Sequence, residues 1–162
     1  MKDSLRTGIS FGLTSAVITT LGLMVGLHSG THSKVVVLAG ILTIAIADAF
    51  SDALGIHISE EAENVHTPKQ IWASTIATFA AKFIFAMTFI VPLILLPLSS
   101  AIFASLIWGM LILTTLSYVM AKAQGEAPWK IVGEHLMIAL VVIAITHWIG
   151  DWIGELGTKW QV

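Results

Sequence analysis

Five long apolar runs, separated by short polar segments, account for nearly the whole chain of 162 residues. With their helical extensions they cover residues 7–28, 34–63, 70–97, 99–121 and 129–157. Each contains an apolar stretch that meets the requirement of about 20 residues for a helix crossing a bilayer. The pattern predicts an all-α, polytopic membrane protein with five transmembrane helices in a single domain over residues 1–162.

Composition agrees with this class and excludes others. Hydrophobic residues make up 56% of the chain and charged residues 11%, whereas soluble domains carry about 25% charged residues. There is no basic patch with interleaved aromatic residues, so no nucleic-acid partner is expected. Motifs such as HExxH and GxSxG are missing as well, so we expect neither an enzyme nor a tightly bound cofactor.

Basic residues predict the orientation. Five of them fall on the side of the first residue and two on the opposite side of the membrane, namely Lys2, Arg6, Lys69, Lys122 and Lys130 against Lys34 and Lys159. Because cytoplasmic loops carry the excess of Lys and Arg, the N-terminus is expected in the cytoplasm and the C-terminus outside or in a lumen. The membrane would be the cell membrane of a prokaryote or an organelle membrane of a eukaryote.

Two aspartates interrupt the second run. Asp48 and Asp52 are four residues apart and therefore share one helix face. A carboxylate inside a membrane span faces protein, water or an ion, so these residues indicate a functional site. Lys82, inside the third run, either pairs with one of them or extends its ammonium toward the interface.

The second run ends in an acidic extension that reaches beyond the hydrocarbon core. His57, Glu60, Glu61 and Glu63 lie there. Closely spaced like charges are either a solvated helix end or a site that attracts divalent cations.

Two further groups complete the candidate residues. In the first run, glycines and hydroxyl residues such as Ser15 and Thr19 serve helix packing or line a pathway. In the last run, His147 and Asp151 form one stripe near the end opposite the acidic extension. That stripe is either an ordinary polar helix end or a second station of a pathway across the membrane.

Taken together, the motifs resemble those of the vacuolar iron transporter family. The resemblance rests on GLTSAVITTLGLMVGL in the first run, SDALGIHIS over residues 51–59 with Glu63 after it, PLILLP in the third run, and GEAPWK before the last. It implies a homodimer that exports ferrous iron or manganese from the cytoplasm, by exchange for protons. The family's cytoplasmic metal-binding helices have no counterpart between Glu63 and Pro68, which marks a divergent short member.

Departures from the family pattern shift the expected metal. Ser15 stands where the family has an aspartate, and Asp52 where it has a methionine. Replacing a soft thioether by a carboxylate favours manganese or other hard cations. We therefore expect a divalent metal ion transporter in which Asp48, Asp52, His57 and the three glutamates bind metal, while Ser15, Thr19, Lys82, His147 and Asp151 line the pathway or relay protons. The alternative is a transport-inactive scaffold or accessory subunit with an Asp–Lys82 structural ion pair.

Overall fold

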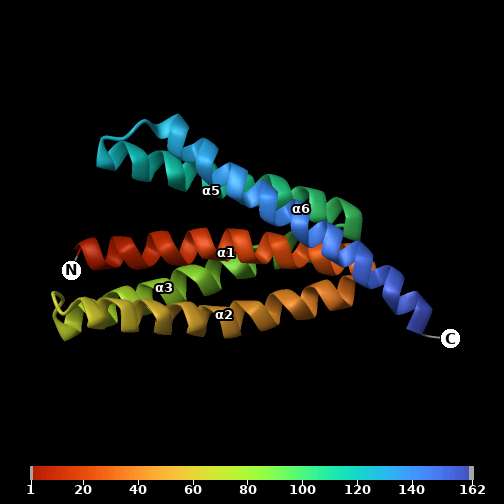
Figure 1. Cartoon of the computed structure of the whole chain (residues 1–162), viewed down its shortest axis with the longest axis horizontal. Helices are drawn as coiled ribbons and strands as arrows, with labels where there is room; N and C mark the ends of the chain where they lie inside the picture. Colours follow the sequence, from red (N-terminus) through yellow and green to blue (C-terminus); the bar gives the residue numbers. More distant parts are fainter. Residues whose placement is uncertain (1, 161–162) are drawn as a thin grey trace. The chain divides into compact units, whose positions relative to one another are not determined.

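A computed structural model of the chain describes residues 2–160, and helices are the only regular secondary structure over that range apart from short turns (Figure 1). The helices are α1 (Lys2–Thr31), α2 (Lys34–Glu63), α3 (Pro68–Thr88), α4 (Ile90–Leu95), α5 (Leu98–Gln124) and α6 (Pro128–Trp160). Five spans are long and apolar enough to cross a membrane, with α3 and α4 together forming the third. The prediction of an all-α, five-span architecture is confirmed.

The third span departs from the single run expected over residues 70–97. Its helix is interrupted at Phe89 and ends at Leu95, so that Pro97 precedes α5. Pro92 explains the interruption, because proline has no N–H to donate to the carbonyl of Thr88, four residues earlier. The proline therefore divides the third span into two helices.

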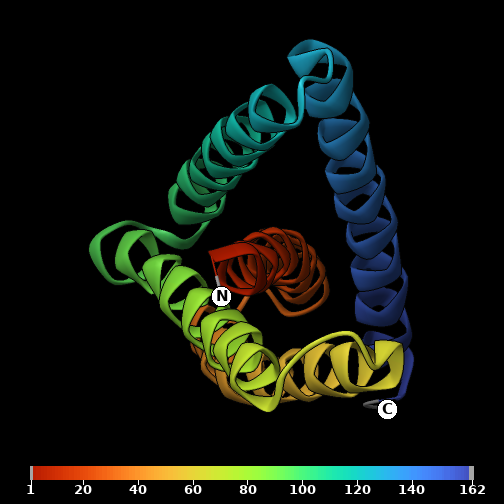
Figure 2. The same ribbon diagram turned by 90° about the vertical axis from the view of Figure 1, so that its left-hand side faces the viewer.

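Helix ends elsewhere lie outside the predicted limits by several residues. α1 begins at Lys2 and α6 extends to Trp160, because helical hydrogen bonding continues past the apolar part of a span into its polar flanks. The turn after α5 is fixed by Gly125, whose φ of 76° lies in the left-handed region that glycine adopts without strain. Its N–H caps the carbonyls of Ala121 and Lys122, and this turn joins α5 to α6 in Figure 2.

Contacts divide the chain into two units. The first comprises residues 1–16 and 42–88, which are the beginning of α1, most of α2 and all of α3. The second comprises residues 17–41 and 89–162, in which α5 packs against α6.

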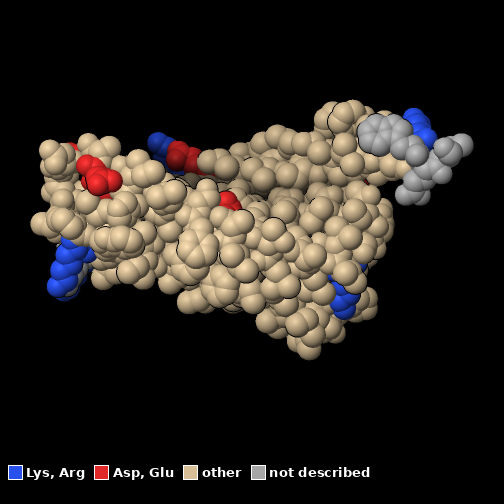
Figure 3. All heavy atoms as spheres, turned by 90° about the horizontal axis from the view of Figure 1, so that it is seen from below, with Lys and Arg blue, Asp and Glu red and all other residues tan. Residues whose placement is uncertain are grey.

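Many large apolar side chains are exposed on the surface. One face, drawn in Figure 3, consists mostly of side chains other than Lys, Arg, Asp and Glu. Large exposed residues such as Phe50, Leu54 and Ile58 follow one another along α2 at helical spacing. A surface of this kind is suited to lipid, and the chain is an integral, multi-pass membrane protein.

Candidate functional site

The candidate site lies in the first unit, where α3 places Lys82 against the two aspartates of α2. Only 1% of the Lys82 side chain is exposed, and its ammonium forms ion pairs with both Asp48 and Asp52. Of the two expectations for Lys82, the structure shows the ion pair. Asp48 and Asp52 are 28% and 18% exposed, so the carboxylates lie at the edge of the packed region and the lysine lies inside it.

The ammonium of Lys82 lies close to three oxygens, two of which accept hydrogen bonds from it. Lys82 Nζ donates hydrogen bonds to Asp52 and, at 2.8 Å, to the hydroxyl of Ser15 on α1. The contact with Asp48 is an ion pair without hydrogen-bonding angles. When all three groups are ionised, two negative charges face one positive charge, and the cluster carries a net charge of −1.

The cluster lies in the middle of its spans. Asp48 is 14 residues from the start of α2 and Lys82 is 14 residues from the start of α3. At 1.5 Å per residue, each lies about 21 Å from that end of its helix. If these spans are centred in a hydrocarbon core about 30 Å thick, charges at this position lie inside that core.

Two glycines bring α1 close enough for Ser15 to join. A Cβ at Gly12 would lie 2.5 Å from the carbonyl oxygen of Thr78 on α3, and a Cβ at Gly8 would collide with the backbone of Ser74. These contacts place the α1 and α3 backbones against one another, as small residues commonly do between membrane helices. Ser15, three residues beyond Gly12, then faces Lys82.

The glutamates in the acidic extension of α2 differ in their exposure to solvent. Glu60 is buried, and its carboxylate accepts a 2.6 Å hydrogen bond from the hydroxyl of Ser74. Glu61 and Glu63 are exposed, and Glu63 lies 3.3 Å from the ring of His66. Glu60 therefore faces α3, whereas Glu61 and Glu63 face away from it, so the three glutamates do not form one exposed group.

His57 also faces α3. Its Nδ1 and the hydroxyl of Thr75 share a 2.9 Å hydrogen bond, and its ring lies edge-on to Trp72, with 4.9 Å between centroids. These residues border an apolar groove between α2 and α3, which Phe50 and Phe79 also line. The six residues expected to bind metal thus do not form one group: Asp48 and Asp52 contact Lys82, while His57 and Glu60 contact hydroxyls of α3.

Sequence reasoning missed two buried hydroxyls of α3. Ser74 and Thr78 have no exposed surface, and with Lys82 they form a stripe at intervals of four residues. The hydroxyl of Thr78 is buried and makes no hydrogen bond to any described residue. The four-residue spacing of Ser74, Thr78 and Lys82 was the signal in the sequence that could have revealed this stripe.

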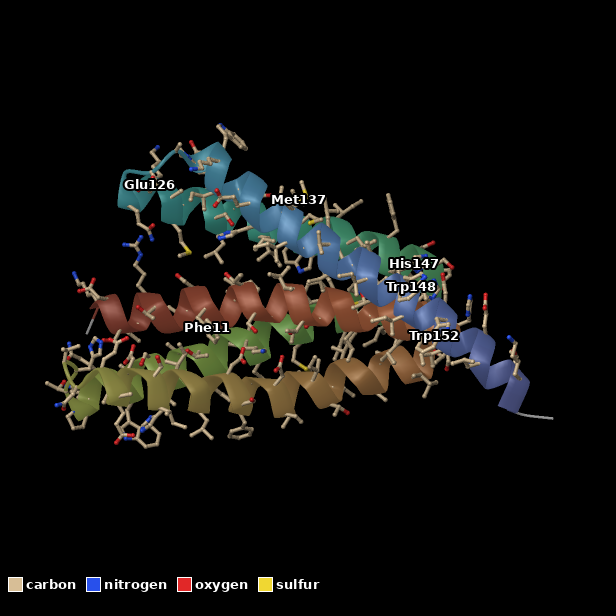
Figure 4. The ribbon with its side chains drawn as sticks, viewed as in Figure 1. Phe11, Glu126, Met137, His147, Trp148 and Trp152 are labelled. Atoms are coloured by element: carbon tan, nitrogen blue, oxygen red, sulfur yellow. The ribbon has the colours of Figure 1, made fainter. Side chains whose placement is uncertain are left out.

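The second unit contains the other predicted station. His147 lies on α6, one residue before Trp148 (Figure 4). It shares a short hydrogen bond with the hydroxyl of Ser29 on α1, and its Nε2 lies 3.5 Å from Asp151. The neighbouring His28 ring lies 5.5 Å from that of His32. Sequence reasoning found His147 and Asp151 from their shared helix face but missed the α1 residues, because the α1–α6 contact is not encoded in spacing.

That contact depends on small residues of both helices. A Cβ on Gly30 would lie 3.0 Å from the carbonyl oxygen of Gly150, and one on Gly154 would lie 3.0 Å from that of Gly30. Thr19, another predicted pathway residue, belongs to this second unit. Within residues 2–160, no three His, Asp or Glu side chains are gathered as a group that could hold a metal ion.

Comparison with known proteins does not assign a family or a function to the chain. Neither a protein-family model nor a curated protein sequence matches the chain.

Proposed function

We propose that this protein transports divalent metal ions, with manganese and ferrous iron as the substrate class, and that it exports them from the cytoplasm in exchange for protons. The observation that supports this proposal is the unequal charge of the intramembrane cluster. Asp48 and Asp52 share a single lysine, so one negative charge has no counter-charge of its own.

An unbalanced charge in an apolar span is expensive. A purely structural ion pair needs one carboxylate and one ammonium, and a second aspartate would only add to the cost. A cation or a proton taken up by the cluster would remove the excess charge. The second aspartate is therefore accounted for if the cluster exists to bind and release positive charge.

The chemistry of the ligands favours hard divalent cations. Carboxylate and hydroxyl oxygens surround the ammonium of Lys82, and such oxygens suit manganese better than soft metals. An arriving metal ion would compete with the ammonium for the same carboxylates. Lys82 would then act as the group that the metal displaces and that returns to the carboxylates once the metal has left.

The remaining residues extend this cluster into a pathway. With the N-terminus in the cytoplasm, exposed Glu61 and Glu63 would raise the local concentration of cations at the cytoplasmic end of α2. His147 and Asp151 lie near the end of α6 on the opposite side of the membrane, where they would take up protons. The resemblance to vacuolar iron transporters supports both this direction and a homodimeric assembly.

A scaffold or accessory subunit without transport is the second candidate. The burial of Lys82 and its contacts with both aspartates favour it, because a buried ion pair also holds helices together. The two candidates differ in what they require of Asp48. A scaffold needs only the hydrogen-bonded pair of Asp52 and Lys82, whereas a transporter needs the additional charge.

The decisive experiment measures Mn²⁺ flux into proteoliposomes under an imposed pH gradient for the parent and for Asp48→Asn. We expect Asp48→Asn to fold normally, by circular dichroism and gel filtration, and to lose about tenfold or more of the flux, since a charged ligand is removed. Glu126→Gln, in the exposed turn before α6, should behave as the parent does. Unchanged flux in Asp48→Asn, or no Mn²⁺ flux in the parent, would reject the proposed function.

A further inference from the structure

A continuous row of buried polar groups connects Glu60 to the charged cluster within the first unit. Glu60 bonds to Ser74, and Thr78 and Lys82 follow Ser74 along the same stripe of α3. These groups face α1 and α2 in the packed interior of the unit. Buried polar groups normally have partners, because an unsatisfied one costs about 1–3 kcal/mol.

Thr78 is the exception in that row. Its side chain is completely buried, yet its hydroxyl has no hydrogen-bond partner among the described residues. Helix packing alone does not explain a hydroxyl here, since valine has nearly the same shape and would avoid the cost. The hydroxyls of Thr20 and Ser105 in the second unit also lack a partner within residues 2–160, but of these three only Thr78 lies on the stripe between Ser74 and Lys82. Its oxygen is therefore positioned to bind a group that passes along this stripe.

We infer that Glu60, Ser74 and Thr78 form the route by which a hard divalent cation, or its hydrated form, passes between the Glu63 end of α2 and the Asp48–Asp52 cluster. The inference rests on the proposed function and adds the path and its intermediate ligand. Carboxylate and hydroxyl oxygens are the ligands that such cations prefer. The hydroxyl of Thr78 would be the intermediate ligand, because Thr78 lies on α3 between Ser74, which bonds to Glu60, and Lys82 of the charged cluster.

Spacing along α3 fits a stepwise transfer. Ser74, Thr78 and Lys82 are four residues apart, so each step rises about 6 Å along the helix. Metal–oxygen distances are about 2.0–2.6 Å for the small hard cations. A cation that retains a coordinated water can therefore contact one oxygen directly and the next through that water. Without Thr78, the step from Ser74 to the cluster doubles to about 12 Å.

The same contacts explain why the route is closed in this conformation. α1 and α3 are held together by backbone contacts at Gly8 and Gly12. α2, by contrast, is joined to α3 through side chains, at Glu60–Ser74 and at the aspartates of Lys82. For the route to open, the carboxylates of α2 must leave their partners on α3 and bind the cation. The contact between α1 and α3 does not change in this step.

The first test uses the absence of cysteine from the chain, which lets a single introduced thiol report on its own position. Thr78→Cys in proteoliposomes should react with Ag⁺ or a small methanethiosulfonate, and Mn²⁺ should slow the reaction about fivefold or more. Ala77→Cys is the matched control, because Ala77 is buried next to Thr78 and packs against Gly8. If Thr78→Cys reacts no faster than Ala77→Cys, or Mn²⁺ gives no protection, the route is wrong.

The second test separates this inference from the proposed function. Thr78→Val should lower Mn²⁺ flux about fivefold, the effect of losing one oxygen contact worth about 1 kcal/mol. Equilibrium binding of Mn²⁺ at the cluster should stay within about twofold, and Thr78→Ser should restore flux. Parent-like flux in Thr78→Val would overturn the route while leaving transport standing. A parent that carries no Mn²⁺ would reject transport, and the thiol experiment would still decide access to Thr78.

Discussion

The ammonium of Lys82 and the hydroxyl of Ser15 are joined by a 2.8 Å hydrogen bond between α3 and α1. A carboxylate at the position of Ser15 would give the cluster a third negative charge, whereas the hydroxyl satisfies the ammonium without adding one. Among residues 2–160, the two aspartates of α2 are the negatively charged partners of the lysine.

Removing the ammonium should destabilise the protein and at the same time increase its response to metal. In Lys82→Met, two carboxylates lose their buried counter-charge, and we expect the free energy of unfolding to fall by about 3–5 kcal/mol. Mn²⁺ should then raise the melting temperature more than in the parent, because it no longer competes with the ammonium. Thermal melts in detergent with and without Mn²⁺ provide the measurement.

The double variant Asp48→Asn/Lys82→Met serves as control. It retains one carboxylate in place of two and should recover part of the lost stability. A Lys82→Met protein that melts like the parent would show that the ion pairs contribute nothing to the fold.

The two aspartates should differ in their effect on stability. Asp48→Asn leaves a neutral pair of Asp52 and Lys82, so its melting temperature should equal or exceed that of the parent. Asp52→Asn removes the carboxylate that is hydrogen-bonded to Lys82 and should cost about 1.5–3 kcal/mol. Both should weaken the stabilisation by Mn²⁺. The reverse order of melting temperatures would contradict the assignment of the hydrogen-bonded partner.

Packing of α1 on α3 gives a prediction that involves no charge. In Gly12→Ala, the new methyl group would lie 2.5 Å from the carbonyl oxygen of Thr78, and overpacking of this kind costs about 1–3 kcal/mol. Gly55→Ala on α2 is the control, because a Cβ there meets no atom within 4 Å. It should stabilise the helix by about 0.5–1 kcal/mol. Equal melting temperatures for both variants would refute the close approach of the two backbones.

Glu60 and Glu61 are neighbours in sequence but should respond differently to the loss of charge. Glu60→Gln should keep the hydrogen bond from Ser74 and the melting temperature, but lower Mn²⁺ flux about tenfold, as expected when a charged ligand on the route becomes neutral. Glu61→Gln changes an exposed residue, so at saturating Mn²⁺ its flux should match the parent. Equal losses in both variants would indicate a shared surface role and no special position for Glu60.

The number of helices and their membrane-spanning character could be predicted from the sequence, because an apolar run of about 20 residues matches a helix that crosses a bilayer and few other structures. Spacing within one helix also predicted which residues lie together, because residues four apart, such as Asp48 and Asp52, share a helix face whatever surrounds them. The break at Phe89 could not be predicted, because a proline indicates that a helix is disturbed but not whether the helix bends or ends.

Contacts between helices were the part that the sequence did not determine. Lys82 had two acceptable environments, and only the rotation of α3 against α2 decides between them. Glu60 illustrates the same limit. Exposed Glu61 is the next residue, but the helix turns by about 100° between them, which is enough to bury one carboxylate and expose the other. Ser29 of α1 could not be assigned to His147 for an equivalent reason, because the two residues come from helices far apart in the chain.

The short turn between α2 and α3 has a consequence for biogenesis. Each aspartate or lysine at the centre of a span costs about 2.5–3.5 kcal/mol when a helix is inserted alone. Only the four residues from Asn64 to Thr67 separate the two helices, so Lys82 can meet Asp48 and Asp52 while both helices are still at the translocon. The hairpin would then partition into lipid as one unit with a net charge of −1, and the lysine would act first as an insertion partner for the aspartates.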